Sequence, residues 1–313
     1  MNNKKPIISI CIPTYNREIS LKELIECIIN QEGFSEDIEI MIYNDPSSDN
    51  TQSMVEWYQK KYSNIRYHRN QVRIGMIPSI LDAIQMCRWE YVWLFSDDDL
   101  MAKNTIKTMI EVIKEQKPWL ILNKMLWFSD KIVVKTKIEN NKWTINSVIG
   151  MEELLNFLST INYSMDWYLA HCSLFCFKKD IYIKNLEILL KEYWPTYIET
   201  LNADYLAHVK IVYLPFWNKE KIVVIAKDLV LVRWGNISWN YKFKVTQDYK
   251  NLINELHKRY KINKKTYKKM IRLHYYSIFL YVVIVHIQKY LPKKVYNSLI
   301  NIWRKMIKLI KIW

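Results

Sequence analysis

Glycine and proline are scarce in this chain of 313 residues, which holds only four glycines and eight prolines. Flexible connections between domains are usually rich in these residues, so their scarcity argues against two bodies joined by a flexible linker. Hydrophobic residues make up 50% of the chain, which excludes an intrinsically disordered protein. A chain of this length and composition can bury one large core or two modest ones.

Cysteine is also limited. Five cysteines are scattered along the chain, their number is odd, and none forms a CxxC pair. This pattern favours buried thiols in a reducing compartment over a zinc site or a disulfide framework. The amino terminus leads into a short strand-like run and lacks the long apolar segment that a signal peptide needs. We therefore expect a cytoplasmic protein.

Acidic residues are nearly missing from one part of the chain. Residues 241–313 contain 18 of the 46 Lys and Arg residues but only two acids, Asp248 and Glu255. The first 240 residues keep 28 basic and 29 acidic groups, so the net charge of +15 comes entirely from the last segment. We predict a main domain over 1–240 and a basic helical extension over 241–313.

No hydrophobic run in the extension is long enough to cross a bilayer. Residues 275–287 are mostly apolar, but this stretch falls short of the ~20 residues that a spanning helix needs. After Pro292, helical spacing would place one apolar face with Trp303 and Trp313 against one face of Lys, Arg, Asn and Ser. A basic amphipathic helix with tryptophans suits an anionic membrane surface. A helix packed on the main domain is the alternative; a nucleic-acid surface is disfavoured because no such binding motif accompanies the charge.

Strand and helix patterns alternate through the first part of the chain. Strand patterns cover residues 7–12, 38–43, 64–69 and 90–95. Helix patterns follow from about residue 20, where Ser20 and Glu23 stand in capping-box register, and at about 49–61, 77–87 and 105–117. Such alternation predicts right-handed βαβ units, an α/β fold with a mostly parallel sheet, and a nucleotide-binding half over 1–117.

Three consecutive carboxylates, Asp97, Asp98 and Asp99, follow the fourth predicted strand. Adjacent carboxylates repel one another, so a positive group is expected among them. In the simplest interpretation, Asp99 caps the next helix and the other two are solvated. In the functional interpretation, they hold Mn²⁺ or Mg²⁺ at the carboxyl end of a buried strand, where open α/β sheets bind their ligands.

Several motifs together suggest a family. They are residues 8–17 (ISICIPTYNR), residues 43–51 (YNDPSSDNT), Asn70 with Gly75, and residues 96–99 (SDDD). In this order and spacing the chain resembles glycosyltransferase family 2, which has the GT-A fold, strongly over residues 7–110 and weakly over 165–240. Within that family it is similar to the branch that builds bacterial surface polysaccharides, such as O-antigen and capsule, and that includes deoxysugar transferases.

The resemblance implies a nucleotide-sugar site. Its residues would be Pro13, Thr14 and Tyr15 at the rim under the base, Asp45 at the N3–H of uracil, Arg17 at the diphosphate, Asp97 at the ribose, and Asp98 with Asp99 at the metal. Pro46, Asn44 and Ser96 depart from the usual family residues. Asp49 is predicted instead to be an ordinary N-cap of the following helix.

Residues 118–240 would then supply the acceptor half. We expect a hairpin of residues 119–128 and 131–137, a helix at 151–158 and a strand at 174–177. A late loop beginning at Arg233 resembles one that closes over the diphosphate. Glu199 and Asp204 are the candidate catalytic bases for deprotonating the acceptor hydroxyl, although either could be a solvated helix position.

The sequence thus predicts a metal-dependent glycosyltransferase, using Mn²⁺ or Mg²⁺. It would transfer sugar from a donor linked to UDP or dTDP to a lipid-linked oligosaccharide, at the inner face of the cell membrane. The products would be surface polysaccharides such as lipopolysaccharide or capsule. The alternative is a non-catalytic nucleotide-sugar or membrane-binding module that keeps the fold.

Overall fold

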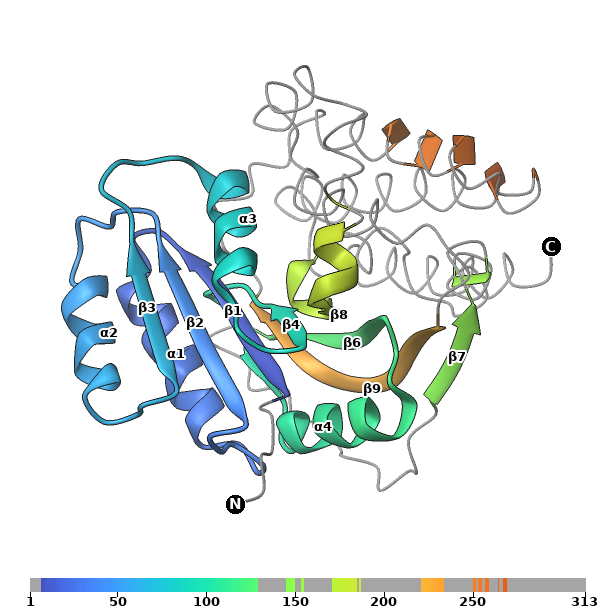
Figure 1. The fold of residues 1–313 in the computed structure, drawn as a ribbon, viewed down its shortest axis with the longest axis horizontal. Coiled ribbons are helices and arrows are strands. Elements are labelled where there is room, and N and C mark those ends of the chain that lie inside the picture. The colour runs from blue at the N-terminus through green and yellow to red at the C-terminus, as the bar shows by residue number, and fades with distance from the viewer. Residues whose placement is uncertain are drawn as a thin grey trace, which may run out of the picture.

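The computed structural model of the chain describes residues 7–128, 145–149, 153–154, 171–184, 186 and 221–233, together with nine helical positions between 250 and 268. Within these residues, helices and strands alternate from the amino terminus, and a single curved sheet runs through the centre (Figure 1). The expected return strand at 131–137, the candidate bases Glu199 and Asp204, and the amphipathic helix after Pro292 lie outside the described residues.

Among the described residues the sheet contains nine strands, in the order β3-β2-β1-β4-β8-β6-β9-β5, and β7 pairs with β9. The strands are β1 (Ile8–Thr14), β2 (Ile38–Asn44), β3 (Ile65–Arg69), β4 (Tyr91–Leu94), β5 (Leu100–Met101), β6 (Leu120–Phe128), β7 (Ile145–Ile149), β8 (Phe175–Lys178) and β9 (Lys221–Arg233). Strands β1 to β4 are parallel to one another. Strand β8 runs antiparallel between β4 and β6, whereas β6 and β9 are parallel. The predicted mostly parallel α/β sheet is confirmed.

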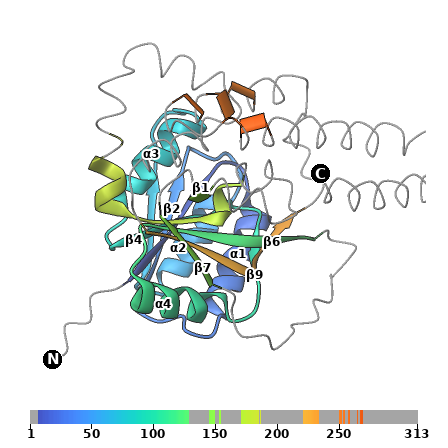
Figure 2. The same cartoon turned by 90° about the vertical axis from the view of Figure 1, so that its right-hand side faces the viewer.

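In the part of the chain that the structure describes, four complete helices accompany this sheet: α1 (Glu18–Ile29), α2 (Thr51–Gln59), α3 (Met76–Met86) and α4 (Thr105–Gln116). Helix α1 contacts α2, and α3 packs on β1 and β2. The chain moves outward from β1 to β3 and then back to β4, so right-handed crossovers put α3 on the opposite face from α1 and α2. Helix α4 contacts β9 and lies below it in Figure 1, and the turned view in Figure 2 also places α4 below the sheet.

The apolar patterns explain the core. Strands β2 and β4 are buried along their whole length, as expected for central parallel strands. Helix α1 buries four residues at helical spacing, Leu21, Leu24, Ile25 and Ile28. Among the described residues, Trp93 of β4 is the largest completely buried side chain, and it meets Phe95 edge-to-face with 5.3 Å between the ring centroids. Burying each such side chain stabilises the fold by about 1.5–3 kcal/mol.

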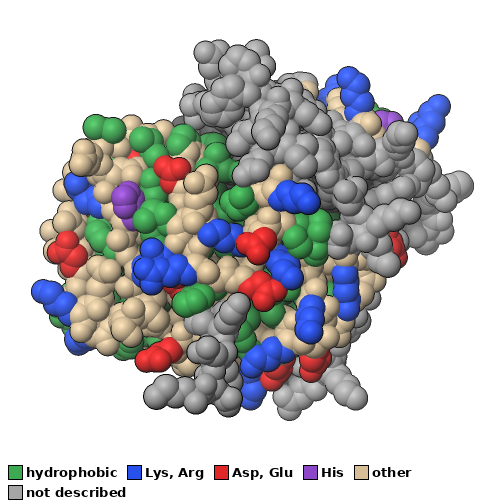
Figure 3. Space-filling view, in the orientation of Figure 1, with side chains coloured by type: hydrophobic (Ala, Val, Ile, Leu, Met, Phe, Trp, Pro, Cys, Tyr) green, Lys and Arg blue, Asp and Glu red, His purple; other side chains and the backbone are tan. Residues whose placement is uncertain are grey.

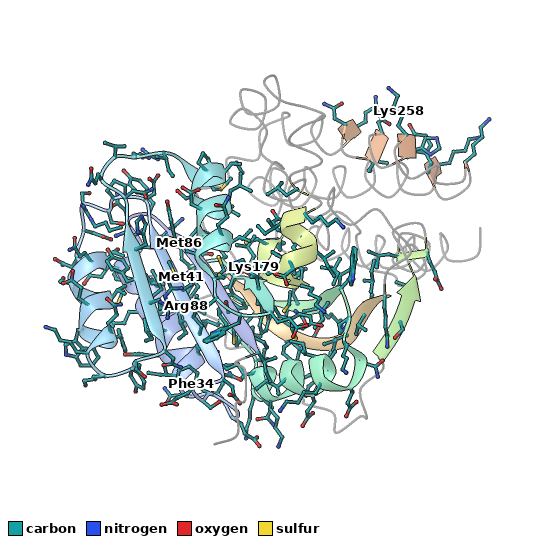
Figure 4. All side chains as sticks on the ribbon, viewed as in Figure 1. Phe34, Met41, Met86, Arg88, Lys179 and Lys258 are labelled. Atoms are coloured by element: carbon teal, nitrogen blue, oxygen red, sulfur yellow. The ribbon has the colours of Figure 1, made fainter. Side chains whose placement is uncertain are left out.

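A buried carboxylate lies among the first strands. Glu39 of β2 accepts hydrogen bonds from the Ser9 hydroxyl and from the Arg88 N–H at 2.9 Å, and pairs with the Arg66 guanidinium at 2.9 Å (Figure 4 labels Arg88). Lys179, also labelled there, donates to the backbone oxygens of Gln85 and Cys87 at the end of α3. Each of these contacts fastens an element to the sheet, and none requires a ligand.

Helix α1 begins differently from the prediction. It starts at Glu18, and the Ser20 hydroxyl donates to the Arg17 carbonyl, so Ser20 is not the N-cap of a capping box. Glu23, the expected second member of that box, pairs instead with Arg233 of β9. A tertiary ion pair has therefore replaced the expected local hydrogen bond of the capping box.

The surface also agrees with the charge count. On the face seen in Figure 3, basic and acidic side chains of the described residues are interspersed, as expected for a main domain with almost no net charge. Among the described residues no helix is long and apolar enough to cross a membrane.

Candidate functional site

The carboxyl ends of β1, β2 and β4 bring the predicted nucleotide residues together. The Thr14 hydroxyl, at the end of β1, donates to Asp97 Oδ2 beyond β4 at 2.8 Å. The backbone N–H of Asp45, beyond β2, donates to the Thr14 carbonyl at 3.0 Å. Arg17 Nε lies 3.9 Å from Asp97 Oδ1. Parallel strands end at the same edge of a sheet, so residues far apart in the sequence become neighbours here.

Asp45 is held in a cradle of N–H donors. Its Oδ1 accepts from the Ile74 N–H at 2.9 Å and from the Asn70 amide at 3.3 Å, and its Oδ2 accepts from the Gly75 N–H at 3.0 Å. Gly75 has φ +91° and ψ 170°, a backbone region that is essentially reserved for glycine. Since each carboxylate oxygen can accept about two hydrogen bonds, Oδ2 keeps room for a further donor.

Arg73 is a site residue that the sequence analysis missed. Its guanidinium lies over the Tyr15 ring, 4.2 Å from the centroid, and its Nε is 3.9 Å from Asp45 Oδ2. Both side chains are exposed, so the pair forms the open side of the site next to Asp45. Its position between Asn70 and Gly75, two motif residues, was the available signal.

A second set of contacts lies behind Asp45. The Tyr43 hydroxyl is 2.8 Å from Asn70 Oδ1 and 2.9 Å from Asp82 Oδ2 of α3, and His68 Nε2 is 3.2 Å from the same Asn70 oxygen. Burial, followed by the Asp82 carboxylate, raises the pKa of Tyr43 to about 12, so its hydroxyl remains a donor at neutral pH. These side chains orient the Asn70 amide toward Asp45.

The acidic turn, defined as residues 96–99, is electrostatically strained. Burial, and then the neighbouring charge of Asp98, raises the pKa of Asp97 to about 7 and that of Asp99 to about 8. The Thr14 hydroxyl and Arg17 oppose the increase at Asp97. Burial and like charge both disfavour the ionised carboxylates, so a cation placed among them would be stabilised.

Asp99 does not cap the next helix. Helix α4 begins at Thr105 with Asn104 in the N-cap position, and Asp99 is only 3% exposed. Its Oδ2 accepts from the Ser173 hydroxyl at 2.5 Å and its Oδ1 from the Arg233 N–H at 3.2 Å. Asp98 is 9% exposed and accepts from the Ser96 hydroxyl. The interpretation as one cap and two solvated carboxylates is therefore wrong.

Arg233 is the last residue of β9, and residues 234–238 of the expected late loop lie outside the described residues. The Nε of Arg233 donates to the Asp98 carbonyl at 3.0 Å and its guanidinium pairs with Glu23 of α1. Arg233 thus connects α1, β9 and the acidic turn, and its charge is paired with Glu23.

Asp49 has the structural role that was predicted, with one difference. Its Oδ1 accepts from the N–H and the hydroxyl of Thr51, and its Oδ2 accepts from the Glu18 N–H at 3.1 Å. Asn50, not Asp49, occupies the formal N-cap position of α2. Asp49 therefore satisfies the first N–H groups of both α1 and α2.

The acidic turn fits a metal ion that is completed by substrate. No group of three or more His, Cys, Asp or Glu side chains in the described part of the chain could hold a metal alone. Magnesium sites in nucleotide-dependent enzymes use one or two carboxylates and take the remaining ligands from phosphate and water. The turn offers hard oxygen ligands of this kind, beside the nucleotide residues.

Residues 9–179, more than half of the chain, match the model of the family "Glycosyl transferase family 2". The chain belongs to this family and is a glycosyltransferase. The abequosyltransferase RfbV of Salmonella typhimurium is 29% identical over 248 residues, which cover 76% of this chain and 70% of that protein. The GalNAc(5)-diNAcBac-PP-undecaprenol beta-1,3-glucosyltransferase of Campylobacter jejuni is 32% identical over 111 residues, 35% of either chain.

The fold of this family 2 glycosyltransferase agrees with solved structures. TarS residues 1–349 of S. aureus, in complex with UDP-GlcNAc, superpose with a TM-score of 0.61, covering 89% of this chain and 75% of that chain at 17% identity. At this identity the likeness concerns the fold alone. The expected GT-A type of fold is thereby confirmed.

Proposed function

We propose that this glycosyltransferase is metal-dependent and transfers sugar from a UDP- or dTDP-linked donor to a lipid-linked oligosaccharide in bacterial surface polysaccharide synthesis. One observation carries the proposal: the acidic turn and the cradle of Asp45 lie at the same sheet edge, joined through Thr14. A nucleoside diphosphate needs a polar contact at its base and neutralisation at its phosphates. These two features meet those needs in adjacent positions.

The base would be recognised by Asp45. Its Oδ2 has room for one more donor, and uracil and thymine present an N3–H there. Cytosine presents an acceptor at the same atom and would face repulsion from the carboxylate. Tyr15 and Pro13 would support the base from the end of β1, and the Arg73 guanidinium could donate to a carbonyl oxygen of the ring.

The diphosphate would lie over the acidic turn. Asp98, with Asp99, would hold Mn²⁺ or Mg²⁺, and Asp97 would accept from the ribose. When bound, the ion supplies positive charge for the diphosphate of the departing nucleotide. Arg17, and Arg233 from β9, would add positive charge at the same place. Glu199 or Asp204, outside the described residues, would act as the base on the acceptor hydroxyl.

Calorimetry on the full-length protein tests the base assignment. With MnCl₂ present, UDP or dTDP should bind at least about tenfold more tightly than CDP, since a lost hydrogen bond plus a repulsive contact costs more than about 1.4 kcal/mol. Release of free nucleoside diphosphate from a panel of donors then identifies the sugar. A clear preference for CDP contradicts the role of Asp45, and turnover that survives exhaustive chelation contradicts the metal.

The membrane part of the proposal rests on charge. Residues 241–313 carry 18 basic groups against two acids, and the name of the Campylobacter relative specifies an undecaprenol-linked acceptor. We propose a catalytic domain over 1–240 and a membrane-associating region over 241–313, peripheral at the inner face of the membrane. Each Lys or Arg near anionic lipid contributes about 1 kcal/mol.

A truncation tests this association. Ile253 is completely buried in the core and Tyr267 packs against it, so the cut must lie beyond Lys268. Truncation after Gln288 removes seven of the 18 basic groups and the expected amphipathic helix, so it should weaken binding to phosphatidylserine vesicles at low salt while UDP binding persists. Binding of the full chain should weaken as salt is added. If the full chain ignores these vesicles, the region has another role.

A further inference from the structure

Ser173 lies in a short 3₁₀ turn, η1 (Cys172–Leu174), immediately before β8. It is completely buried, and 74 residues separate it from Asp99 in the sequence. The turn nevertheless contacts both β4 and β6. A residue of the acceptor half is thus placed directly against the acidic turn.

Neighbouring strands fix the backbone of this residue. The Trp93 indole Nε1 of β4 donates to the Ser173 carbonyl at 2.8 Å. The Asn123 amide of β6 donates to the Leu174 carbonyl at 3.4 Å. Trp93 and Asn123 are both completely buried, so the position of the Ser173 side chain is set by the core rather than by solvent.

The hydroxyl of Ser173 spans the acidic turn from one end to the other. It accepts from the Ser96 N–H at 2.9 Å and donates to Asp99 Oδ2 at 2.5 Å. A serine hydroxyl can do both at once, since it has one donor and two acceptor positions. The Arg233 N–H donates to Oδ1 of Asp99, so both oxygens of this carboxylate accept hydrogen bonds.

We propose that Ser173 is a positioning residue for the metal site, acting through Asp99 and the shape of the acidic turn. This inference rests on the metal-dependent function proposed above. Ser173 itself would touch neither donor nor metal. Carboxylates that bind metals are themselves hydrogen-bonded, and loss of such a supporting partner typically reduces metal affinity or activity by about 10- to 100-fold.

A merely structural hydroxyl would behave differently. Removing it would lower the unfolding midpoint and leave the Mn²⁺ requirement unchanged. A positioning hydroxyl should instead raise the Mn²⁺ concentration needed for half-maximal turnover, while kcat at saturating Mn²⁺ stays closer to that of the wild type. The Mn²⁺ dependence therefore separates the two roles.

The test uses Ser173→Ala in the full-length protein. Ser79→Ala is the matched control, because Ser79 of α3 is equally buried and its hydroxyl has no hydrogen-bond partner among the described residues. Mn²⁺ binding in the presence of UDP is measured by paramagnetic resonance of the free ion, and turnover is measured over a Mn²⁺ series. We expect an apparent Kd for Mn²⁺ about 10- to 100-fold higher for Ser173→Ala and unchanged for Ser79→Ala.

The outcomes distinguish failure of the proposed metal-dependent function from failure of the proposed role of Ser173. If wild-type turnover survives chelation, the metal-dependent function fails whatever Ser173 does. If the wild type needs Mn²⁺ but Ser173→Ala binds it as tightly as the control does, the role of Ser173 is overturned. Should Ser173→Ala fail to fold, Ser173→Cys carries the same test, because a thiol fills a similar space but is a weak donor.

Discussion

Asp98→Asn should separate activity from stability, moving them in opposite directions. Asparagine has the shape of aspartate, and its side-chain oxygen can still accept from the Ser96 hydroxyl. What disappears is one negative charge at the proposed metal site. Removing a group that stabilises transition-state charge usually costs about 10²- to 10³-fold in kcat, and we expect a loss of at least that size.

The stability of the metal-free protein should rise instead. Next to burial, the Asp98 charge is the largest cause of the raised pKa values of Asp97, about 7, and Asp99, about 8. An unfolded Asp titrates near 3.9, so the folded protein holds more protons between about pH 4 and 8, and its stability falls as pH rises through that window. Without the Asp98 charge the fall is smaller. We expect the free energy of unfolding of Asp98→Asn to exceed that of the wild type by about 1–2 kcal/mol at pH 8.5, since a pKa difference of one unit corresponds to about 1.4 kcal/mol.

Urea unfolding in EDTA at pH 6 and pH 8.5, together with donor turnover in MnCl₂, measures both effects. Asp180→Asn, at an exposed position, is the matched control and should change neither. The stability difference between Asp98→Asn and the wild type should be larger at pH 8.5 than at pH 6. A variant that is less stable than the wild type at that pH, or one whose turnover stays within tenfold, refutes the reasoning.

Three further changes test other parts of the structure. Tyr43→Phe removes the hydroxyl between Asn70 and Asp82 and should weaken UDP binding about 2- to 12-fold by calorimetry, the value of one net hydrogen bond. Gly75→Ala meets no atom within 4 Å, so backbone strain alone should lower the free energy of unfolding by about 1–3 kcal/mol in urea. Glu39→Leu leaves Arg66 without its buried partner and should lower the free energy of unfolding in urea by about 3 kcal/mol, the low end of the usual range because Arg66 is partly exposed. UDP affinity should not change.

Local patterns predicted the first half of the fold well because each pattern there has one interpretation. Strands β1, β2 and β4 are continuous apolar runs followed by helices of suitable length, and only a parallel sheet accommodates that order. The location of the candidate site at one edge of the sheet could be predicted from the same topology, since the motifs lie at the carboxyl ends of the strands. Asp45, Thr14 and Asp97 meet for that reason.

The second half could not be predicted in this way. Strand β9 pairs with β6 over nine register positions, but the register shifts at Asn123 and Lys124, and Lys227 with Asp228 interrupts its apolar pattern. A β-bulge breaks the alternation on which a strand prediction depends. Strand β5 has two residues, Leu100 and Met101, too few to show any period. Ser173 joins the site through contacts that no local pattern encodes.

The acidic turn shows why residues 1–117, which carry the motifs, cannot form the candidate site without the rest of the chain. Residues 96–99 contain like charges whose repulsion opposes folding, and their support comes from Thr14 before them and from Ser173 and Arg233 far after them. Strand β8 also pairs with β4 along residues Tyr91 to Trp93 and so covers that edge of β4. A fragment ending near residue 117 would expose that edge and leave Asp99 without either partner. Residues 1–117 therefore depend on β8 and β9 to support the acidic turn, and the two halves form one structural unit.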